Sequence, residues 1–356
     1  RGKTVITISV CMIVKDEEPV IRRCLSCVKC FADEIIVIDT GSQDQTAAIS
    51  REMGALVDTF AWNDDFAAAR NSSFSRATKD YIFWLDADDV IDEVNQRKLC
   101  ELKQHLDPSV DVVMMRYAMA HAKGATPIVF ERERLLKRSC GFHWQGRIHE
   151  TIATKGTILH SDITICHQKE VVNDPDRNLR IFQIMRQNDE PFSPRDWFYY
   201  ARELNDHGQR DAAIQAYETF LSQEGWVEDQ LQACYDLGVC HLRNNDREQA
   251  LQAYLRSFSY EVPTSRICNA IGFWFLDVQR YAQAAYWFDQ ALRSTHRGGF
   301  ENEDEHLFLP MLELAICYYY LKENELARAW FEAAKAQHPS HSLIIKNEPY
   351  FKREQG

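Results

Sequence analysis

A short strand that ends in carboxylates is the feature that most restricts how this chain can fold. Residues 81–85 are aromatic and aliphatic, which predicts a strand buried on both faces. Asp86 and Asp88 follow this strand directly. In an open α/β sheet, ligands bind outside the carboxyl ends of the strands, and carboxylates suit Mg²⁺ or Mn²⁺. We therefore predict a metal site here, although an isolated Asp-x-Asp can also be an acidic loop that caps the next helix.

Strands and helices alternate at short intervals before this point. We expect strands at residues 5–14, 34–39 and 55–60, and helices at residues 20–30, 44–53 and 64–77. This order is typical of a parallel sheet with helices on both faces. No G-x-G-x-x-G follows the first strand and no phosphate-binding P-loop motif is present, so we expect the metal carboxylates to hold any bound phosphates.

The pattern after Asp89 is more mixed. Residues 111–119 predict an apolar strand, and residues 127–136, which carry Arg and Glu in alternation, predict an edge strand or an exposed ribbon. Residues 140–150 combine aromatic, basic and acidic side chains with two glycines, a mixture that favours a substrate pocket. Residues 163–167 form a further β-rich run that ends in His167.

Composition limits the classes of function. The chain has 356 residues, enough for about two domains. Its net charge of −12 argues against a general nucleic-acid or anionic-membrane binder. No apolar run approaches the ~20 residues of a membrane span, and no signal peptide is visible.

The cysteines carry information about compartment and metal binding. Eleven cysteines without a framework favour a reducing, cytoplasmic setting. Cys24, Cys27 and Cys30 are spaced three apart but lack a nearby fourth ligand. We expect them to pack as small apolar side chains on a helix.

Four ordered blocks, at residues 8–17, 34–46, 64–71 and 84–88, together resemble the family 2 glycosyltransferases of the GT-A fold. The resemblance implies a Rossmann-like, mostly parallel sheet that binds a nucleotide-sugar donor and a divalent metal. It assigns Asp39 to the base, Arg70 to the diphosphate, and Asp86 and Asp88 to ribose and metal. The donor contacts that it implies are Val14, Asp16, Glu17, Asp39, Arg70, Asp86, Ala87 and Asp88.

Several of these residues have a structural alternative. Asp39 with Ser42 can cap the following helix. Arg70 lies in an expected helix and can form a surface ion pair. Asp89 matches the family pattern less well and can be a capping residue or a residue behind the metal ligands.

Inverting glycosyl transfer needs a base for the acceptor's proton and a cation for the leaving diphosphate. Glu150 is the candidate base, because it follows the apolar Trp144 and Ile148. His149 is the alternative base or an orienting partner. Residues 147–150, Arg-Ile-His-Glu, resemble a run found at this point in glycosyltransferases that carry a helical repeat tail. His167 would complete the metal site with Asp86 and Asp88, although a histidine at a strand end is more often a hydrogen-bonded core residue.

The second half of the chain is repetitive. From residue 196 it is rich in Ala, Leu, Tyr and Gln with a helical period, and a small residue recurs ahead of an aromatic one. The pattern resembles tetratricopeptide repeats of about 34 residues, which form an all-α solenoid. The repeat positions are Ala201, Ala213 and Tyr217; Gly238, Ala250 and Tyr254; Gly272, Ala284 and Phe288; and Ala315, Ala327 and Phe331.

We therefore expect a GT-A domain at residues 4–172, a linking helix at 173–195, repeats at 196–340 and a tail at 341–356. The combination resembles the bacterial group that includes the sublancin S-glycosyltransferase. That resemblance implies transfer from a UDP-sugar, with UDP-glucose as the first choice, to Cys or Ser of a peptide or protein. The repeats would hold this acceptor or form a homodimer.

Three other functions stay open. The acceptor can be a glycan or a lipid-linked sugar. The chain can also be a non-catalytic repeat scaffold with a relic sheet domain, which the intact Asp39, Asp86 and Asp88 argue against. A nucleotidyltransferase is disfavoured because no Gly-rich phosphate loop lies near the N-terminus.

Overall fold

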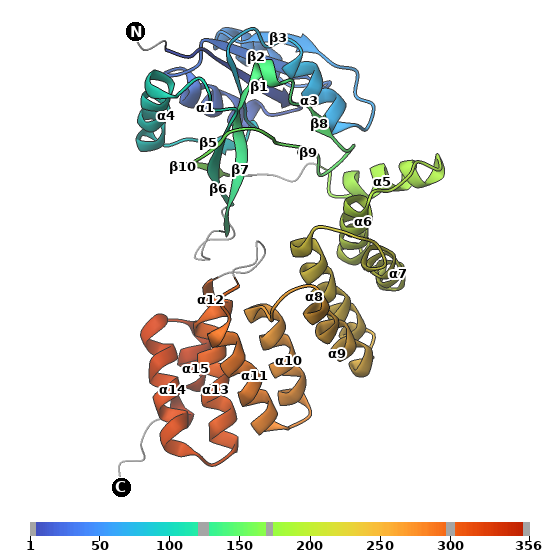
Figure 1. The fold of residues 1–356 in the computed structure, drawn as a ribbon, viewed down its shortest axis with the longest axis vertical. Coiled ribbons are helices and arrows are strands. Elements are labelled where there is room, and N and C mark those ends of the chain that lie inside the picture. The colour runs from blue at the N-terminus through green and yellow to red at the C-terminus, as the bar shows by residue number, and fades with distance from the viewer. Residues whose placement is uncertain (1–4, 120–127, 169–173, 297–302, 352–356) are drawn as a thin grey trace. The chain divides into compact units, whose positions relative to one another are not determined.

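The chain divides into two compact units, residues 1–184 and 185–356 (Figure 1). The computed structural model describes residues 5–119, 128–168, 174–296 and 303–351. The boundary between the units falls inside residues 173–195, the segment expected to join the domains. The exact limits of this linking segment stay a prediction. In the described ranges, no helix combines the length and the apolar character that a membrane crossing requires.

An 8-stranded sheet forms the centre of the first unit, in the order β3-β2-β1-β4-β7-β6-β10-β5. Strands β3, β2, β1 and β4 are parallel, as are β6 and β10, whereas β7 and β5 are antiparallel to their neighbours. This mostly parallel sheet confirms the predicted α/β fold. The strands are β1 Ile8–Val14, β2 Glu34–Asp39, β3 Leu56–Thr59, β4 Tyr81–Trp84, β5 Asp89–Val90, β6 Val112–Met119, β7 Ile128–Lys137 and β10 Ile158–His167, with a separate pair β8 Trp144–Gln145 and β9 Thr151–Ile152.

Helices cover both faces of this sheet. Alternate residues of each strand point to opposite sides, so a strand such as β1 contributes to two cores. Val10 and Met12 of β1 belong to the same core as Leu25 of α1, whereas Cys11 belongs to the core that contains Phe74 of α3. Cys24 and Cys27 are buried in the first of these cores and Cys30 is exposed. The helices of this unit are α1 Glu18–Val28, α2 Thr46–Glu52, α3 Phe66–Phe74 and α4 Glu93–His105, with a 3₁₀ turn at Arg138–Cys140. Helix α5, Arg177–Gln187, spans the boundary between the two units.

Strand β7 is central, so the prediction of an edge strand or exposed ribbon for residues 127–136 was wrong; Pro127 itself lies outside the described residues. β7 lies between β4 and β6. Its Arg134 is fully buried and forms an ion pair of 3.0 Å with the equally buried Asp89. A charged side chain is tolerated inside a protein when it is paired. The alternating charges therefore marked a strand whose inward cation has a buried partner.

The second unit consists of antiparallel helix pairs, which agrees with the predicted repeats. The pairs are α6 Pro194–Asp206 with α7 Arg210–Leu221, α8 Val227–Arg243 with α9 Arg247–Arg256, α10 Ser265–Asp277 with α11 Tyr281–Arg293, and α13 Phe308–Tyr320 with α14 Asn324–Gln337. A 3₁₀ turn, Ser257–Ser259, and the short helix α12, Glu303–His306, lie between pairs.

Small residues in each pair allow the two helices to approach. A Cβ atom added to Gly238 would lie 2.2 Å from the ring of Tyr254, and one added to Gly272 would lie 2.7 Å from the ring of Phe288. Both rings are buried. A small residue recurs ahead of an aromatic one because the aromatic ring packs directly on the backbone of the small residue, where the two helices touch.

The expected C-terminal tail is a helix. Residues 342–351 form α15, Ser342–Phe351, and its Ile344 and Phe351 are buried in the core of the last repeat. The ring of Phe351 stacks on Phe331 with centroids 4.5 Å apart. The apolar residues of this segment thus cover a helix face that the last repeat would otherwise expose.

We expect Gly238→Ala to destabilise the second unit by up to about 2 kcal/mol, the overpacking cost less the gain in helix propensity. The added methyl group would meet the buried Tyr254 ring, and such overpacking costs about 1–3 kcal/mol. The higher helix propensity of alanine offsets at most about 1 kcal/mol of that cost. Urea unfolding followed by circular dichroism measures the difference.

The same substitution in a Tyr254→Leu background is the control, since a smaller side chain removes the ring that the methyl group would meet. We expect the penalty to shrink there or to reverse sign. A stabilising effect of Gly238→Ala in the otherwise unchanged protein would contradict the close contact.

Candidate active site

Parallel pairing brings the sequence motifs to one edge of the sheet. β1 lies between β2 and β4, and Val14 at the end of β1 pairs with Asp39 at the end of β2. On the other side, Cys11 pairs with Trp84, so the residues that follow β4 continue at this same edge. Because parallel strands end on the same side, Asp39 and Asp86 lie at the same edge of the sheet, at the ends of the two strands that flank β1.

The loops after β1 and β2 are tied to each other by side chains. Asp16, which has a φ of 54°, accepts a hydrogen bond of 2.7 Å from the Gln43 amide, and its own amide donates to the Ser42 hydroxyl at 2.9 Å. Oδ1 of Asp39 accepts from the amides of Gly41 and Ser42 at 3.0 and 2.8 Å. Asp39 therefore shapes its own turn through Oδ1. It does not cap α2, whose N-cap residue is Gln45, so the capping alternative for Asp39 with Ser42 was wrong.

The other residues of the expected donor site lie around these loops. The amide of Glu17 donates to the Thr46 hydroxyl at 2.7 Å, which holds residue 17 against the start of α2. Val14 and Ala87 are both buried and offer no polar side chain. Their contribution to any ligand contact would therefore come from the backbone or from shape.

Arg70 joins two carboxylates that are far apart in sequence. It lies on α3, whose first turn is capped by the side chain of Asp65. Its Nη2 donates to Asp86 at 2.8 Å and its Nε donates to Glu150 at 2.6 Å. The guanidinium also packs on the rings of Trp84 and Trp144, 5.4 and 4.9 Å from their centroids. With 12% of its side chain exposed, Arg70 is not a surface ion pair.

These contacts set the charge states of the pair. Burial alone raises the pKa of Asp86, but the nearby cations Arg70 and Arg134 lower it below its ordinary value. Burial alone lowers the pKa of Arg70, but Asp86 and Glu150 raise it above its ordinary value. Asp86 is therefore a carboxylate and Arg70 a cation at any physiological pH.

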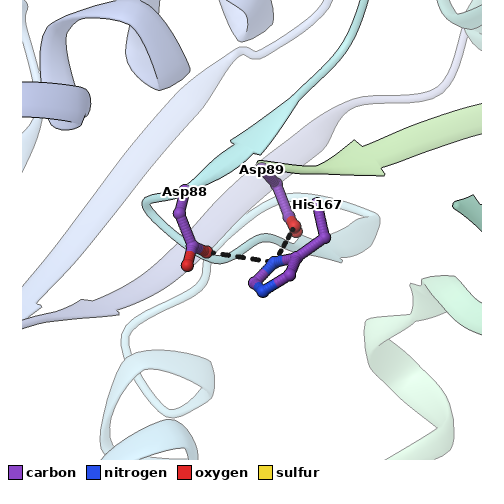
Figure 2. A group of neighbouring side chains, drawn as sticks. All are labelled: Asp88, Asp89 and His167. Atoms are coloured by element: carbon purple, nitrogen blue, oxygen red, sulfur yellow. Dashed lines mark hydrogen bonds and ion pairs between the residues drawn. The ribbon is translucent and has the colours of Figure 1, made fainter. Parts of the chain in front are cut away.

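A second cluster joins Asp88, Asp89 and His167, whose possible ligand atoms all lie within 4.8 Å of one another. His167 reaches this place because the end of β10 pairs with β5, where His167 is opposite Asp89. Figure 2 shows Nδ1 of the imidazole facing both carboxylates, at 3.3 Å from Asp88 and 3.4 Å from Asp89. The hydrogen bonds to Asp88 and then Asp89 raise the pKa of His167 to about 10.

Two residues that the sequence did not single out complete this cluster. The Tyr117 hydroxyl of β6 donates to Asp89 at 2.9 Å, and Arg134 of β7 donates to the same carboxylate at 3.0 Å. Asp89 has no exposed side-chain surface. The one available signal was the two-residue alternation in residues 131–134, which places Arg134 on an inward-facing position.

Glu150 and His149 lie in the loop between β8 and β9. The loop is fastened to α3, since Asn71 exchanges hydrogen bonds of 2.9 and 2.8 Å with the backbone of Trp144. Glu150 reaches the site through Arg70. The ring of His149, which has a φ of 50°, stacks near Phe182 of α5 with centroids 6.4 Å apart.

The arrangement suits a hard divalent cation. Asp88 and His167 offer a carboxylate oxygen and an imidazole nitrogen, a donor set acceptable to Mn²⁺ and Mg²⁺. Asp86, the third predicted metal ligand, is not part of that cluster, and its Oδ1 is bound to Arg70. The carboxylates of Asp86 and Glu150 thus pair with the guanidinium of Arg70, whereas that of Asp88 pairs with His167.

Comparison with known proteins agrees with this fold. Residues 9–156 match the family model for glycosyl transferase family 2. A TPR repeat-containing protein of Synechococcus elongatus is 46% identical over 106 residues, which are 30% of this chain and 26% of the relative. The SPbeta prophage-derived glycosyltransferase SunS of Bacillus subtilis is 26% identical over 212 residues, 56% of this chain and 49% of the relative.

A third relative, an uncharacterized glycosyltransferase of Rickettsia felis, is 33% identical over 92 residues, which are 26% of this chain and 32% of the relative. The chain thus spans half or less of the length of each of these relatives. Residues 9–156 thus match the model of glycosyl transferase family 2, the helices that follow resemble tetratricopeptide repeats, and the chain is similar to the SunS glycosyltransferase.

Proposed function

We propose that the protein is an inverting, metal-dependent glycosyltransferase that moves a sugar from a UDP-sugar, with UDP-glucose as the first choice, to a Cys or Ser side chain of a peptide or protein. The observation that carries the proposal is the convergence of Asp39, Arg70, Asp86, Asp88, Glu150 and His167 at one sheet edge of a family 2 domain.

The charge of the crevice supports metal dependence. A nucleoside diphosphate is an anion, and it would enter a site where carboxylates outnumber the guanidinium of Arg70. Arg70 is already shared between Asp86 and Glu150. Asp88 and His167 would hold a divalent cation, which supplies the positive charge that the leaving diphosphate needs.

Donor placement follows from the two loops at the edge. Since Oδ1 of Asp39 is engaged in its own turn, a contact with the base would fall to Oδ2. Val14, Asp16, Glu17 and Ala87 surround the same edge and would shape the nucleoside pocket. Arg70 stays close to the diphosphate because its aromatic neighbours, Trp84 and Trp144, restrict its side chain.

Glu150 is the proposed base, with His149 as the alternative. Arg70 binds Oε1 of Glu150, which leaves Oε2 to take the acceptor's proton. The thiol of cysteine, with an ordinary pKa of about 8.5, is more acidic than an alcohol and is therefore easier for a carboxylate to deprotonate. This favours cysteine over serine as the acceptor side chain.

The second unit would bring the acceptor. Solenoids of helix pairs present extended surfaces that bind peptides or other subunits. We propose that the repeats hold the acceptor peptide or form a homodimer, and that the enzyme acts in the cytoplasm, where its free cysteines stay reduced.

Asp88→Ala is expected to abolish metal-dependent UDP binding while the fold stays intact, because it removes a carboxylate from the cation site. Calorimetric titration of UDP with and without Mn²⁺ measures this, and circular dichroism checks the fold. Asp162→Ala is the matched control, since Asp162 is an exposed carboxylate of β10 paired with Lys98. UDP binding that still depends on Mn²⁺ in Asp88→Ala would refute the metal role.

Glu150→Gln is expected to keep UDP binding and lose at least about 10²-fold in turnover, since general base catalysis contributes about 10²–10⁴-fold. The amide preserves an oxygen for Arg70 but cannot accept a proton at neutral pH. The assay is UDP release from a panel of UDP-sugars with Mn²⁺, beginning with UDP-glucose.

Glu131→Gln is the control for this pair of measurements, because Glu131 is an exposed carboxylate of β7 that pairs with His160. Normal UDP release by Glu150→Gln would remove Glu150 as the base and leave His149 as the next candidate.

A further inference from the structure

A buried group of side chains lies beneath the proposed metal site, on strands outside the Asp-x-Asp loop. Arg134 comes from β7 and Tyr117 from β6, and both converge on Asp89. Arg134 and Asp89 have no exposed side-chain surface. Tyr117 is 7% exposed. The proposed reaction does not use these three residues, so their arrangement calls for a separate role.

Asp89 is fully committed to these neighbours. Its Oδ2 accepts from Arg134 at 3.0 Å and from the backbone amide of Asp86 at 3.1 Å. Its Oδ1 accepts from the Tyr117 hydroxyl at 2.9 Å. A carboxylate that accepts from a guanidinium inside the protein forms an ion pair, in which the arginine neutralises the charge of the carboxylate. Asp89 is therefore poorly placed to bind a metal, although it belongs to the cluster of possible ligands with Asp88 and His167.

The proton of the Tyr117 hydroxyl determines which tautomer His167 adopts. A hydroxyl has one hydrogen, and that of Tyr117 points to Asp89. Nδ1 of His167 lies 2.9 Å from the same hydroxyl oxygen, which can then only accept from it. The other neighbours of Nδ1 are carboxylate oxygens of Asp88 and Asp89. Nδ1 thus faces three acceptors and carries the hydrogen.

Nε2 is then the nitrogen of His167 that can bind a metal, and a bound cation would take the place of the second proton of the imidazolium. Figure 2 shows it on the far side of the ring from both carboxylates. A histidine that donates one ring N–H to a carboxylate and binds the metal through the other nitrogen is held in one tautomer and one orientation.

We propose that Asp89, supported by Arg134 and Tyr117, is a positioning residue that fixes His167 so that it presents Nε2 to the metal, with Asp88 as the carboxylate ligand. This rests on the proposed metal-dependent function and specifies which residues of the cluster bind the cation and which orient it.

Arg134 makes the arrangement possible. Its Nη1 bonds to Asp89 and to the carbonyl of Trp84 at 3.2 Å, and its guanidinium lies 3.7 Å from the Trp84 ring centroid and 4.3 Å from that of Tyr117. Its Nε and Nη2 are buried and have no hydrogen-bond partner among the described residues. The guanidinium is thus held between two rings, where it neutralises Asp89.

The test is a double-mutant cycle on Mn²⁺ binding with Tyr117→Phe and His167→Ala, measured in the presence of UDP from the electron paramagnetic resonance signal of free Mn²⁺. We expect Tyr117→Phe to weaken Mn²⁺ binding by about 10-fold or more, as loss of a group behind a metal ligand does. In the His167→Ala background, we expect the same substitution to have no further effect. Equal losses in both backgrounds would overturn the proposal, because Tyr117 would then not act through His167.

Tyr81→Phe is the matched control. Tyr81 is a buried tyrosine of β4 whose hydroxyl donates to the Val110 carbonyl at 2.7 Å, away from the site. It loses a buried hydroxyl of the same kind, so it reports the effect of a structural hydrogen bond. A loss of Mn²⁺ affinity in Tyr81→Phe as large as that in Tyr117→Phe would assign the effect to stability and overturn the proposal.

Asp89→Asn separates orientation from ligation. A positioning residue loses its effect once His167 is absent, whereas a ligand does not. We therefore expect Asp89→Asn to weaken Mn²⁺ binding in the unchanged protein and to add nothing in His167→Ala. A further loss in the His167→Ala background would show that Asp89 is itself a ligand, which would refute its positioning role but not the proposed metal site. If the unchanged protein binds no Mn²⁺ with or without UDP, the proposed metal site fails and this inference fails with it.

Discussion

The buried ion pair between Arg134 and Asp89 is the interaction on which the active-site edge depends. It connects the central antiparallel strand β7 to the turn after β4, and through the amide of Asp86 it fixes the turn that carries Asp86 and Asp88. Loss of one partner would leave an unpaired buried charge, at a cost of about 3–5 kcal/mol. The same pair lets β7 occupy the middle of the sheet with charged residues in its sequence.

Arg70, on α3, also connects two segments through carboxylates. It links Asp86, in the turn after β4, to Glu150, although Asp86 lies 16 positions and Glu150 lies 80 positions from Arg70 in the chain. Two tryptophan rings confine it. The two arginines therefore differ: Arg134 neutralises one fully buried carboxylate, whereas Arg70 joins the two partly exposed carboxylates of Asp86 and Glu150.

The second unit depends on a different physical constraint. Its helix pairs approach closely because glycine or alanine faces a buried aromatic ring, as at Gly238 and Gly272. This packing is local to each pair, so the repeats form their core without the sheet domain. A solenoid also needs its last helix covered, and α15 covers it with Ile344 and Phe351.

The sequence by itself determined the alternation of strands and helices up to β4 and the helical repeats, because strand and helix periods, the Asp-x-Asp turn and the spacing of small and aromatic residues are local signals. It also placed Asp39, Asp86 and Asp88 at one edge, since parallel strands end on the same side. Only the tertiary structure decided that β7 is central, that Arg70 binds both Asp86 and Glu150, and that Tyr117 and Arg134 surround Asp89. These facts come from strand order and from contacts between distant residues, which local patterns do not encode: a charged side chain looks solvent-exposed in sequence until its buried partner is known.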